Sequence, residues 1–324
     1  MSNMEKNKFS IINRKNVIML FLLLVVYGAV QILQSNGILS RFYLLTLILA
    51  CIYIIMAVSQ NLITGFTGQL AIGHAGFMAI GAYMSAMVVV KMNGHVVAGL
   101  IFGALMAALA GILIGIPTLR LRGDYLAIAT LGLGEIVRIF FLNWDYLGGA
   151  TGFQVPKSMN WTWAFWLMVL SVVVIKNFIN SSHGRACISI RENEIAAEAM
   201  GINTTKYKVI AFALGAMFAG LAGGIYANFM FFIQPGTFSF LKSFEILVMV
   251  VLGGLGSITG SIIGAVIMTV VSAVLADVPE LRMVIIAVLL IIIMIFRPNG
   301  ILGTKEFNLN FLNPQKKGEE NGTT

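Results

Sequence analysis

The feature that most constrains this chain is a series of apolar runs, each about as long as a lipid bilayer is thick. A helix needs about 20 apolar residues to cross the hydrocarbon core. Only 10% of the 324 residues are charged, whereas about a quarter of the residues of a soluble domain are charged. The sequence therefore predicts an all-α membrane protein with about ten transmembrane helices. The runs fall near residues 17–34, 42–60, 70–90, 96–117, 125–142, 161–176, 208–230, 244–258, 260–276 and 283–296.

The basic residues predict on which side of the membrane each connection lies, because Lys and Arg concentrate in cytoplasmic segments. With the N-terminus inside, inner segments hold fifteen basic residues, outer segments hold five, and Arg138 falls within a span. Both termini are therefore predicted to be cytoplasmic, and this orientation accounts for the formal net charge of +8 without nucleic-acid binding. The inner set is Lys6, Lys8, Arg14, Lys15, Arg120, Arg122, Lys176, Arg185, Arg191, Lys206, Lys208, Arg297, Lys305, Lys316 and Lys317, and the outer set is Arg41, Lys91, Lys157, Lys242 and Arg282.

The apolar runs leave little length for a separate soluble domain. We expect one transmembrane domain at residues 17–303, preceded by a cytoplasmic segment at 1–16 and followed by a cytoplasmic tail at 304–324. The first run has no small-residue cleavage site after it, which predicts an uncleaved helix rather than a signal peptide. Cys51 and Cys187 are too few for a disulfide framework and are expected to be unpaired.

Two uncharged, glycine-rich stretches interrupt the apolar pattern, at residues 61–77 and 252–261. Backbone that leaves the helix at membrane depth is tolerated where it is buried in protein or lines a cavity. Broken helices at corresponding places in two halves often mark a transport site; tight helix–helix turns are the alternative. With five spans per half, any repeat of spans 2–5 in spans 7–10 has to be inverted. This inverted repeat is a hypothesis, because no residue-level similarity supports it.

Few ionisable side chains are expected inside the membrane, where each one is costly. Glu135 and Arg138 lie three residues apart on one helical face and are predicted to form an intramembrane ion pair. Pairing explains both charges structurally, and a polar lining of a pathway is the alternative. His74 is expected to hydrogen-bond within the first glycine-rich stretch. One pair and one histidine are a poor basis for an ion-coupled carrier.

The longest inner connection that is not lipid-like runs over residues 181–208. Within it, Glu192 and Glu194 are expected to open a short helix, and Gly201 stands where a helix C-cap belongs. An apolar stripe is formed by residues at helical spacing, namely Ile195, Ala199 and Ile202. The helix is expected either to dock into a groove on a partner or to pack against the membrane end of its own chain.

The sequence contains no GxxxxGK(S/T) phosphate loop, so the chain is not expected to hydrolyse ATP. It also shows no catalytic constellation and no metal-binding spacing. We therefore expect no enzyme activity, no catalytic residues, no metal site and no cofactor on this chain. Any energy for transport has to come from another chain.

The cytoplasmic loop carries the first specific resemblance. Residues 194–201 (EIAAEAMG) resemble the EAA loop of bacterial ABC importer permeases. Longer stretches narrow the resemblance to the LivM-type permeases of branched-chain amino acid importers, and together they cover most of the chain from about Tyr43 to Gly303. Ala71, Ser261 and the 147–152 segment depart from the usual pattern, which bears on the substrate because family members also serve urea and short amides. The matching stretches are 61–83, 119–138, 184–227 and 296–303.

The resemblance implies a multi-pass subunit of a heteromeric importer in a bacterial inner membrane. Its partners would be a homologous second permease, two cytoplasmic ATPase subunits that bind ATP, and an extracytoplasmic substrate-binding protein. The motif implies that the coupling residues are Arg185, Arg191, Glu192, Glu194, Ala197, Glu198 and Gly201. Polarity alone suggests a set of pathway-lining residues, namely Asn61, Thr64, Gln69 and Thr130.

Three classes of function follow from these observations. The first is a permease of a binding-protein-dependent ABC importer for branched-chain, hydrophobic amino acids, with urea or short amides as the alternative substrate. The second is an ion-coupled or passive carrier that works without ATPase partners. The third is a structural membrane anchor for another complex.

Overall fold

The computed structural model describes residues 14–37, 39–118, 121, 123–297, 300–301 and 303. The chain divides into two compact units, Met1–Leu45 with Phe307–Thr324 and Thr46–Glu306. The first unit contains helix α1 (Arg14–Ser35) and the first residues of α2 (Arg41–Asn61). All features of the candidate site lie in the second unit. The two ends of the chain, which are predicted to be cytoplasmic, lie outside the described residues.

Helices occupy the positions of the expected apolar runs. Six stretches within the described residues are long and apolar enough to cross a membrane: Arg41–Phe66, His74–Lys91, Val96–Thr118, Asp124–Leu142, Trp161–Asn180 and Thr204–Met230. The prediction of about ten spans is thus supported for six. The number ten, the inverted repeat and the cytoplasmic termini stay predictions. After α1 and α2, the long helices are α3 (His74–Ala86), α4 (Val96–Thr118), α5 (Asp124–Leu142), α6 (Trp161–Asn180), α9 (Thr204–Met230), α10 (Phe240–Gly253), α11 (Ile258–Val274) and α12 (Pro279–Phe296).

The glycine-rich stretches set several helix boundaries that differ from the expected runs. After α2 the chain makes one turn of π-helix at Leu62–Phe66, leaves the helix, and re-enters it only at His74. A second π-helical turn, Met87–Lys91, ends this span. In the other stretch, α10 stops at Gly253 because Gly254 has a φ of +121°, a conformation that side chains other than glycine rarely adopt.

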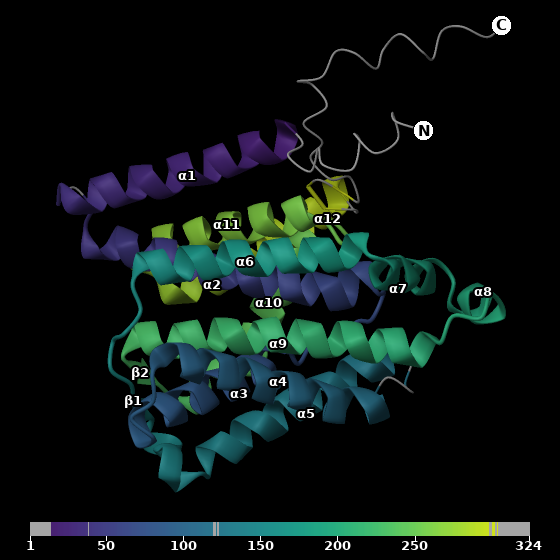
Figure 1. The fold of residues 1–324 in the computed structure, drawn as a ribbon, viewed down its shortest axis with the longest axis horizontal. Coiled ribbons are helices and arrows are strands. Elements are labelled where there is room, and N and C mark those ends of the chain that lie inside the picture. Colours follow the sequence, from purple (N-terminus) through teal and green to yellow (C-terminus); the bar gives the residue numbers. More distant parts are fainter. Residues whose placement is uncertain are drawn as a thin grey trace, which may run out of the picture. The chain divides into compact units, whose positions relative to one another are not determined.

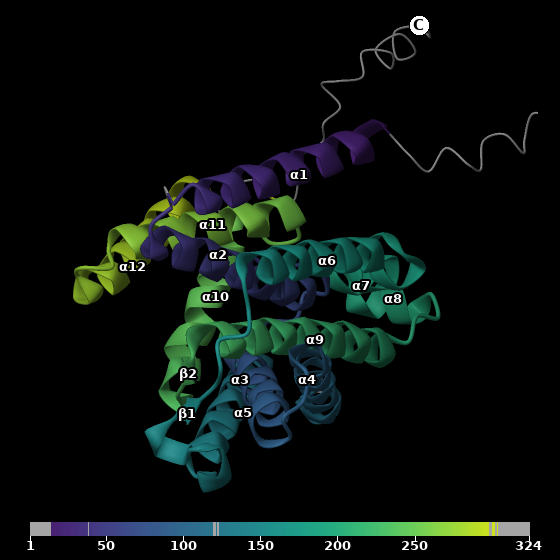
Figure 2. The ribbon, with the colours of Figure 1, turned by 60° about the vertical axis from the view of Figure 1, so that its left-hand side comes forward.

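Helix α9 is the central element of the second unit. It lies alongside α3 and α4 in both views of the ribbon (Figure 1, Figure 2). Gly220 of α9 lies close to the backbone of α3. A Cβ atom on Gly81 of α3 would overlap the backbone of Gly220. Small residues let helices approach at the backbone, which is how they gain packing energy in lipid. Gly220 and Gly224, which are four residues apart on α9, therefore serve helix packing here.

Short elements close the two ends of this unit (Figure 1). At one end, strands β1 (Phe153–Gln154) and β2 (Phe232–Ile233) pair antiparallel, with Phe153 opposite Ile233. Three 3-10 turns, Asp145–Leu147, Gly149–Thr151 and Pro235–Phe238, belong to the same connections. At the other end, the 181–208 loop forms α7 (Ser182–Glu192) and α8 (Glu194–Ala199).

The loop holds two short helices where the sequence predicted that Glu192 and Glu194 open one. That prediction was wrong for Glu192, which is the last residue of α7. Asn193 has extended backbone (φ −159°, ψ 109°), and its side chain accepts a hydrogen bond from the Ala196 nitrogen at 3.0 Å. Asparagine is a strong N-cap, so it begins a new helix at Glu194 and changes the chain direction.

Candidate functional site

The two glycine-rich stretches, which are far apart in sequence, meet at Asn61. The Asn61 Nδ2 donates to the Ser257 carbonyl oxygen at 2.9 Å, and its Oδ1 accepts from the Gly256 nitrogen at 2.9 Å. The side chain is fully buried. One carboxamide therefore bonds two backbone groups of the second glycine-rich stretch and supplies the partner that the buried Gly256 N–H requires. We call Asn61, Gly65, Gly256 and Ser257 the glycine joint.

Glycine is required at this joint for space and for conformation. A Cβ atom on Gly65 would overlap Asn61 Oδ1 and the Gly256 nitrogen. Gly256 itself has a φ of +81°, which costs other residues about 1–2 kcal/mol. The hydrogen bonds of Asn61 form because neither glycine carries a side chain.

Arg191, at the end of α7, connects the 181–208 loop to the glycine joint. Its Nη1 donates to the Gly65 carbonyl oxygen at 3.0 Å, while its Nε donates to Glu192 Oε1 at 3.0 Å. The guanidinium also lies against Gly256, where a Cβ atom would be 2.6 Å from Nη1. Arginine suits this place because its planar fork of donors can bond two acceptors at once. The loop is therefore bonded to one glycine-rich stretch and packed against the other.

Hydrogen bonds and an ion pair hold helix α8 to its neighbours. Gly201 has a φ of +82° and donates to the Glu198 carbonyl oxygen at 2.9 Å, and Ile202 donates to the Ala197 carbonyl oxygen at 3.0 Å. These two bonds make a Schellman cap, so the predicted C-cap is confirmed. Glu194 forms an ion pair with Lys208 of α9 at 2.7 Å.

Other contacts of the predicted coupling residues follow the same pattern. The Glu198 carboxylate accepts a hydrogen bond from the Thr204 hydroxyl at 2.7 Å, which joins α8 to the first turn of α9. Ala197 is buried. Arg185 is exposed and donates to the Asn180 carbonyl oxygen at 3.1 Å. Each coupling residue therefore lies on α7, α8 or the turn after it.

The exposed side chains of α8 and of the turn after it are mostly apolar. Ile195 is 72% exposed and Met200 is 83% exposed, and Ala199 is exposed as well, whereas Ala197 faces the protein. The predicted apolar stripe is therefore incomplete. Ile202 lies after the cap and is half-buried, so it does not share the exposed surface. Apolar side chains at the tip of a polar loop are the kind of surface that a partner covers.

The predicted pathway residues are buried, and each forms a hydrogen bond in or beside the first glycine-rich stretch. Thr64 accepts from Gln60 Nε2 at 3.0 Å, Gln69 donates to the Lys208 carbonyl oxygen at 3.4 Å, and Thr130 accepts from the Ile72 nitrogen at 3.0 Å. Within the described residues, Gln69 Oε1 is buried without a hydrogen-bond partner. These contacts stabilise the break, and a role in contacting solute stays a prediction.

The predicted pair of Glu135 and Arg138 forms, and it has a further contact. The Arg138 Nε lies 2.6 Å from Glu135 Oε2. The other oxygen of Glu135 accepts from the Phe240 nitrogen at 2.9 Å, so the carboxylate caps the first turn of α10. A carboxylate at a helix N-terminus is favourable because unpaired N–H groups and the helix dipole meet there. His74 does form a hydrogen bond, at 2.8 Å, but its partner is Ser59 Oγ of α2 and lies outside the glycine-rich stretch where it was predicted.

A second charged pair was not predicted, and Lys242, which was predicted to lie in an outer connection before the next helix, lies within a helix. Helix α10 begins at Phe240, before the expected run, so Lys242 lies inside it. Its Nζ is 2.9 Å from Glu245 Oε2 and 2.5 Å from the Tyr53 hydroxyl. The sequence did carry a signal for this pair: Lys242 and Glu245 are three residues apart, as are Glu135 and Arg138. The structure therefore holds a second, buried ion pair that was not predicted from the sequence.

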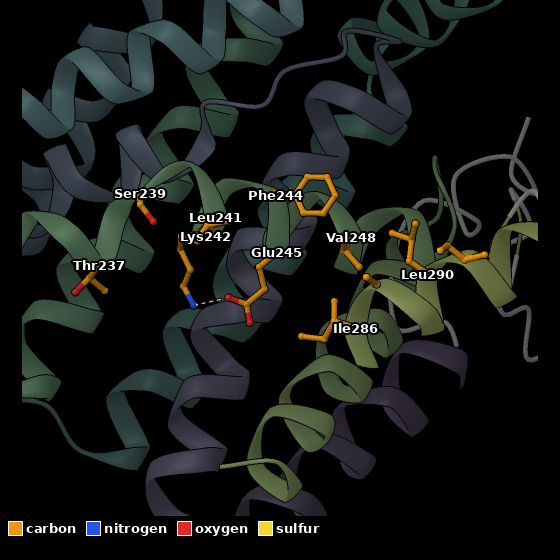
Figure 3. A pocket seen from close by; sticks show the side chains of 11 residues that line it. Thr237, Ser239, Leu241, Lys242, Phe244, Glu245, Val248, Ile286 and Leu290 are labelled. Carbon is orange, nitrogen blue, oxygen red and sulfur yellow. Dashed lines mark hydrogen bonds and ion pairs between the residues drawn. The ribbon is translucent and has the colours of Figure 1, made fainter. Parts of the chain in front are cut away.

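The Lys242–Glu245 pair borders a cavity of about 590 Å³ between α10 and α12 (Figure 3). Within the described ranges, no group of three or more His, Cys, Asp or Glu residues is placed to hold a metal ion. Cys51 and Cys187 are free, as expected. Burial raises the pKa of the Cys187 thiol to about 11, so this loop cysteine is protonated at neutral pH.

Comparisons with known proteins agree with this arrangement. A family model described as the permease component of branched-chain amino acid transport systems matches residues 42–294. The high-affinity branched-chain amino acid transport system permease protein LivM of Escherichia coli K12 is 36% identical over 312 residues, covering 84% of this chain and 72% of that protein. The corresponding LivH protein of Salmonella typhimurium is 28% identical over 286 residues, covering 78% and 92%. No solved structure matches. This multi-pass membrane protein belongs to the family of permease components of branched-chain amino acid transport systems.

Proposed function

We propose that the chain is the membrane-spanning permease subunit of a binding-protein-dependent ABC importer for branched-chain, hydrophobic amino acids. One observation carries the proposal: Arg191 bonds the cytoplasmic loop to the joint between two broken membrane segments. A movement of the loop therefore has a direct path to backbone at membrane depth. A self-sufficient carrier has no need of such a connection. The names of the relatives favour amino acids over urea or short amides.

The energy in this proposal comes from partner subunits. Two cytoplasmic ATPases bind and hydrolyse ATP, and the apolar face of α8, with Ile195 and Met200 at its tip, docks in a groove on one of them. A homologous second permease and an extracytoplasmic binding protein complete the importer. Closure of the ATPases moves α7 and α8 together, because Asn193 caps both helices where they meet, and the contacts of Glu194 and Glu198 pass the movement from α8 to α9.

The coupling residues have distinct parts in this movement. Arg191 transmits it to the glycine joint, and Glu192 orients the guanidinium. Opening of the joint exposes the polar side chains around the first break to solute. The proposed pathway residues remain Asn61, Thr64, Gln69 and Thr130, and the proposed coupling residues remain Arg185, Arg191, Glu192, Glu194, Ala197, Glu198 and Gly201.

The proposed topology has ten crossings with both termini cytoplasmic, in a bacterial inner membrane. It places α7 and α8 inside and the β1–β2 end outside, in keeping with the distribution of basic residues. An inverted relation between spans 2–5 and 7–10 is part of this proposal. The ion pairs inside the membrane are neutral overall, so they do not trap a zwitterionic solute by net charge.

A pulldown with membrane partners tests the ATPase interface. Wild-type chain is expected to retain an ATPase subunit, and Gly201→Asp is expected to lose it while still inserting in the membrane. The substitution forces a non-glycine residue into a φ of +82° and adds charge beside α8. Gly236→Asp is a matched control, because Gly236 is exposed at the β1–β2 end and a Cβ atom there meets nothing within 4 Å.

If no ATPase is recovered with the wild-type chain in several mild detergents, the importer proposal fails. The carrier hypothesis then becomes the leading one. Uptake into proteoliposomes holding the whole complex then tests the substrate. We expect leucine uptake that requires both ATP and the binding protein, and no such uptake of urea. Urea uptake without leucine uptake would assign the chain to the alternative substrate class.

A further inference from the structure

The cavity beside α10 has the size and walls of a small-molecule site. Its volume of about 590 Å³ lies within the range of roughly 300–1,000 Å³ that is usual for ligand pockets. It opens between α10 and α12, and its polar groups converge at one side (Figure 3). The apolar part of the wall is formed by Leu241, Phe244, Val248, Ile286, Leu290 and Ile291.

Two opposite charges stand together in this wall. The side chains of Lys242 and Glu245 are only 12% and 10% exposed, and their charged atoms are 2.9 Å apart. Burying such a pair costs several kcal/mol of desolvation, and hydrophobic residues of the same size often serve stability equally well. A buried pair beside a cavity at membrane depth therefore indicates function rather than stability.

Tyr53 keeps Lys242 in place independently of Glu245. Its hydroxyl is 2.5 Å from the Lys242 Nζ, and the same ammonium lies 4.3 Å from the centre of the tyrosine ring. Both contacts stabilise a cation. The Lys242 ammonium can therefore exchange its carboxylate partner without losing all of its contacts.

We propose that this cavity binds an amino acid zwitterion with an apolar side chain during its passage. Lys242 receives the carboxylate of the solute, Glu245 receives its ammonium group, and the apolar wall covers its side chain. The site stays neutral with or without solute, because a zwitterion adds one charge of each sign. This inference rests on the proposed function and names the residues that recognise the substrate inside the membrane.

The position of the cavity agrees with this role. Lys242 lies in the first turn of α10, directly after the Pro235–Phe238 turn that follows β2. In the proposed topology this is the outer end of the permease, where a binding protein delivers solute. Urea carries neither charge and so gains nothing from the pair, which makes the site a filter for zwitterions.

Cysteine protection in the complete complex tests the site directly. Thr237 lines the cavity, whereas its exposed neighbour Gly236 does not. We would introduce Thr237→Cys or Gly236→Cys and label the reconstituted importer with a small methanethiosulfonate reagent. The native cysteines are buried, and wild-type chain gives their background. Millimolar leucine is expected to slow labelling of Thr237→Cys at least threefold, urea to leave it unchanged, and neither to affect Gly236→Cys.

A second variant ties the protection to the charges. Glu245→Gln keeps the side-chain shape and is expected to abolish protection by leucine and to lower ATP-dependent leucine uptake at least tenfold. Retention of the ATPase subunit by this variant shows that it still assembles. Equal labelling with and without leucine, in a complex that transports leucine, overturns the inference and leaves the proposed function intact. Labelling of the isolated chain but not of the complex also overturns it, because another subunit then covers the cavity. Absence of ATP-dependent uptake by the wild-type complex contradicts the proposed function instead.

Discussion

Arg191 donates a hydrogen bond from its Nη1 to the carbonyl oxygen of Gly65, 3.0 Å away and 126 residues distant in sequence. This bond joins the last turn of α7 to the first glycine-rich stretch, residues 61–77. The same guanidinium lies against Gly256 of the second break. Two glycine-rich interruptions of the helices are thus in contact with a single side chain of the 181–208 loop, so in the proposed importer loss of Arg191 should separate ATP hydrolysis from transport.

The first prediction is that Arg191→Ala lowers ATP-dependent uptake at least tenfold while the ATPase subunits stay bound. Arg191→Lys should recover little, because one ammonium cannot reproduce the fork that bonds both Gly65 and Glu192. Uptake per ATP hydrolysed in proteoliposomes is the measurement. Lys206→Ala, which removes another exposed basic residue of the loop, is the control. Wild-type uptake by Arg191→Ala would show that the bond to Gly65 carries no coupling.

The second prediction concerns space at the glycine joint. Gly65→Ala should destabilise the folded permease by about 1–3 kcal/mol through overpacking, because its Cβ atom would overlap Asn61 and the Gly256 backbone. Gly132→Ala in α5 is the matched control, since a Cβ atom there meets nothing within 4 Å. Thermal unfolding in detergent should show a lower melting temperature for the first variant alone. Equal melting temperatures would mean that the joint is looser than these contacts imply.

The third prediction separates backbone strain from crowding at Gly201. A Cβ atom at this position meets nothing within 4 Å, so a substitution costs only the left-handed conformation. That cost is about 1–2 kcal/mol for alanine and smaller for asparagine, which tolerates this region. Gly201→Asn should therefore keep more ATPase subunit in a quantitative pulldown than Gly201→Ala. The reverse order would indicate that a partner surface excludes the larger side chain.

The fourth prediction concerns the two contacts of Glu135. Glu135→Leu removes both the partner of Arg138 and the acceptor of the Phe240 N–H, so two polar groups lose their bonds and the melting temperature should fall. Glu135→Gln can still accept from Phe240, so its melting temperature should lie between those of wild type and Glu135→Leu. The thermal shift of purified permease measures the order. Identical values for the two variants would show that the cap on α10 contributes nothing.

Some features of this protein follow from short stretches of sequence alone. The apolar runs predict membrane helices because a bilayer requires a continuous apolar length and no distant residue can supply it. The cap at Gly201 and the pair of Glu135 with Arg138 are equally local, since their partners lie within a few residues. The family resemblance added the prediction that the loop couples to an ATPase, which composition could not supply.

Other features were decided only when distant segments packed together. Asn61 bonds Gly256 across 195 residues, and nothing in either stretch states that they meet. The start of α10 was misplaced because Glu135, on another helix, supplies the cap to Phe240, and the burial of Lys242 follows from that start. Local pattern determined which segments are helical and which side chains are neighbours along one helix. Tertiary packing decided which backbone groups and charges needed partners. An unpaired polar group costs free energy where water cannot reach it, and packing determines where that is.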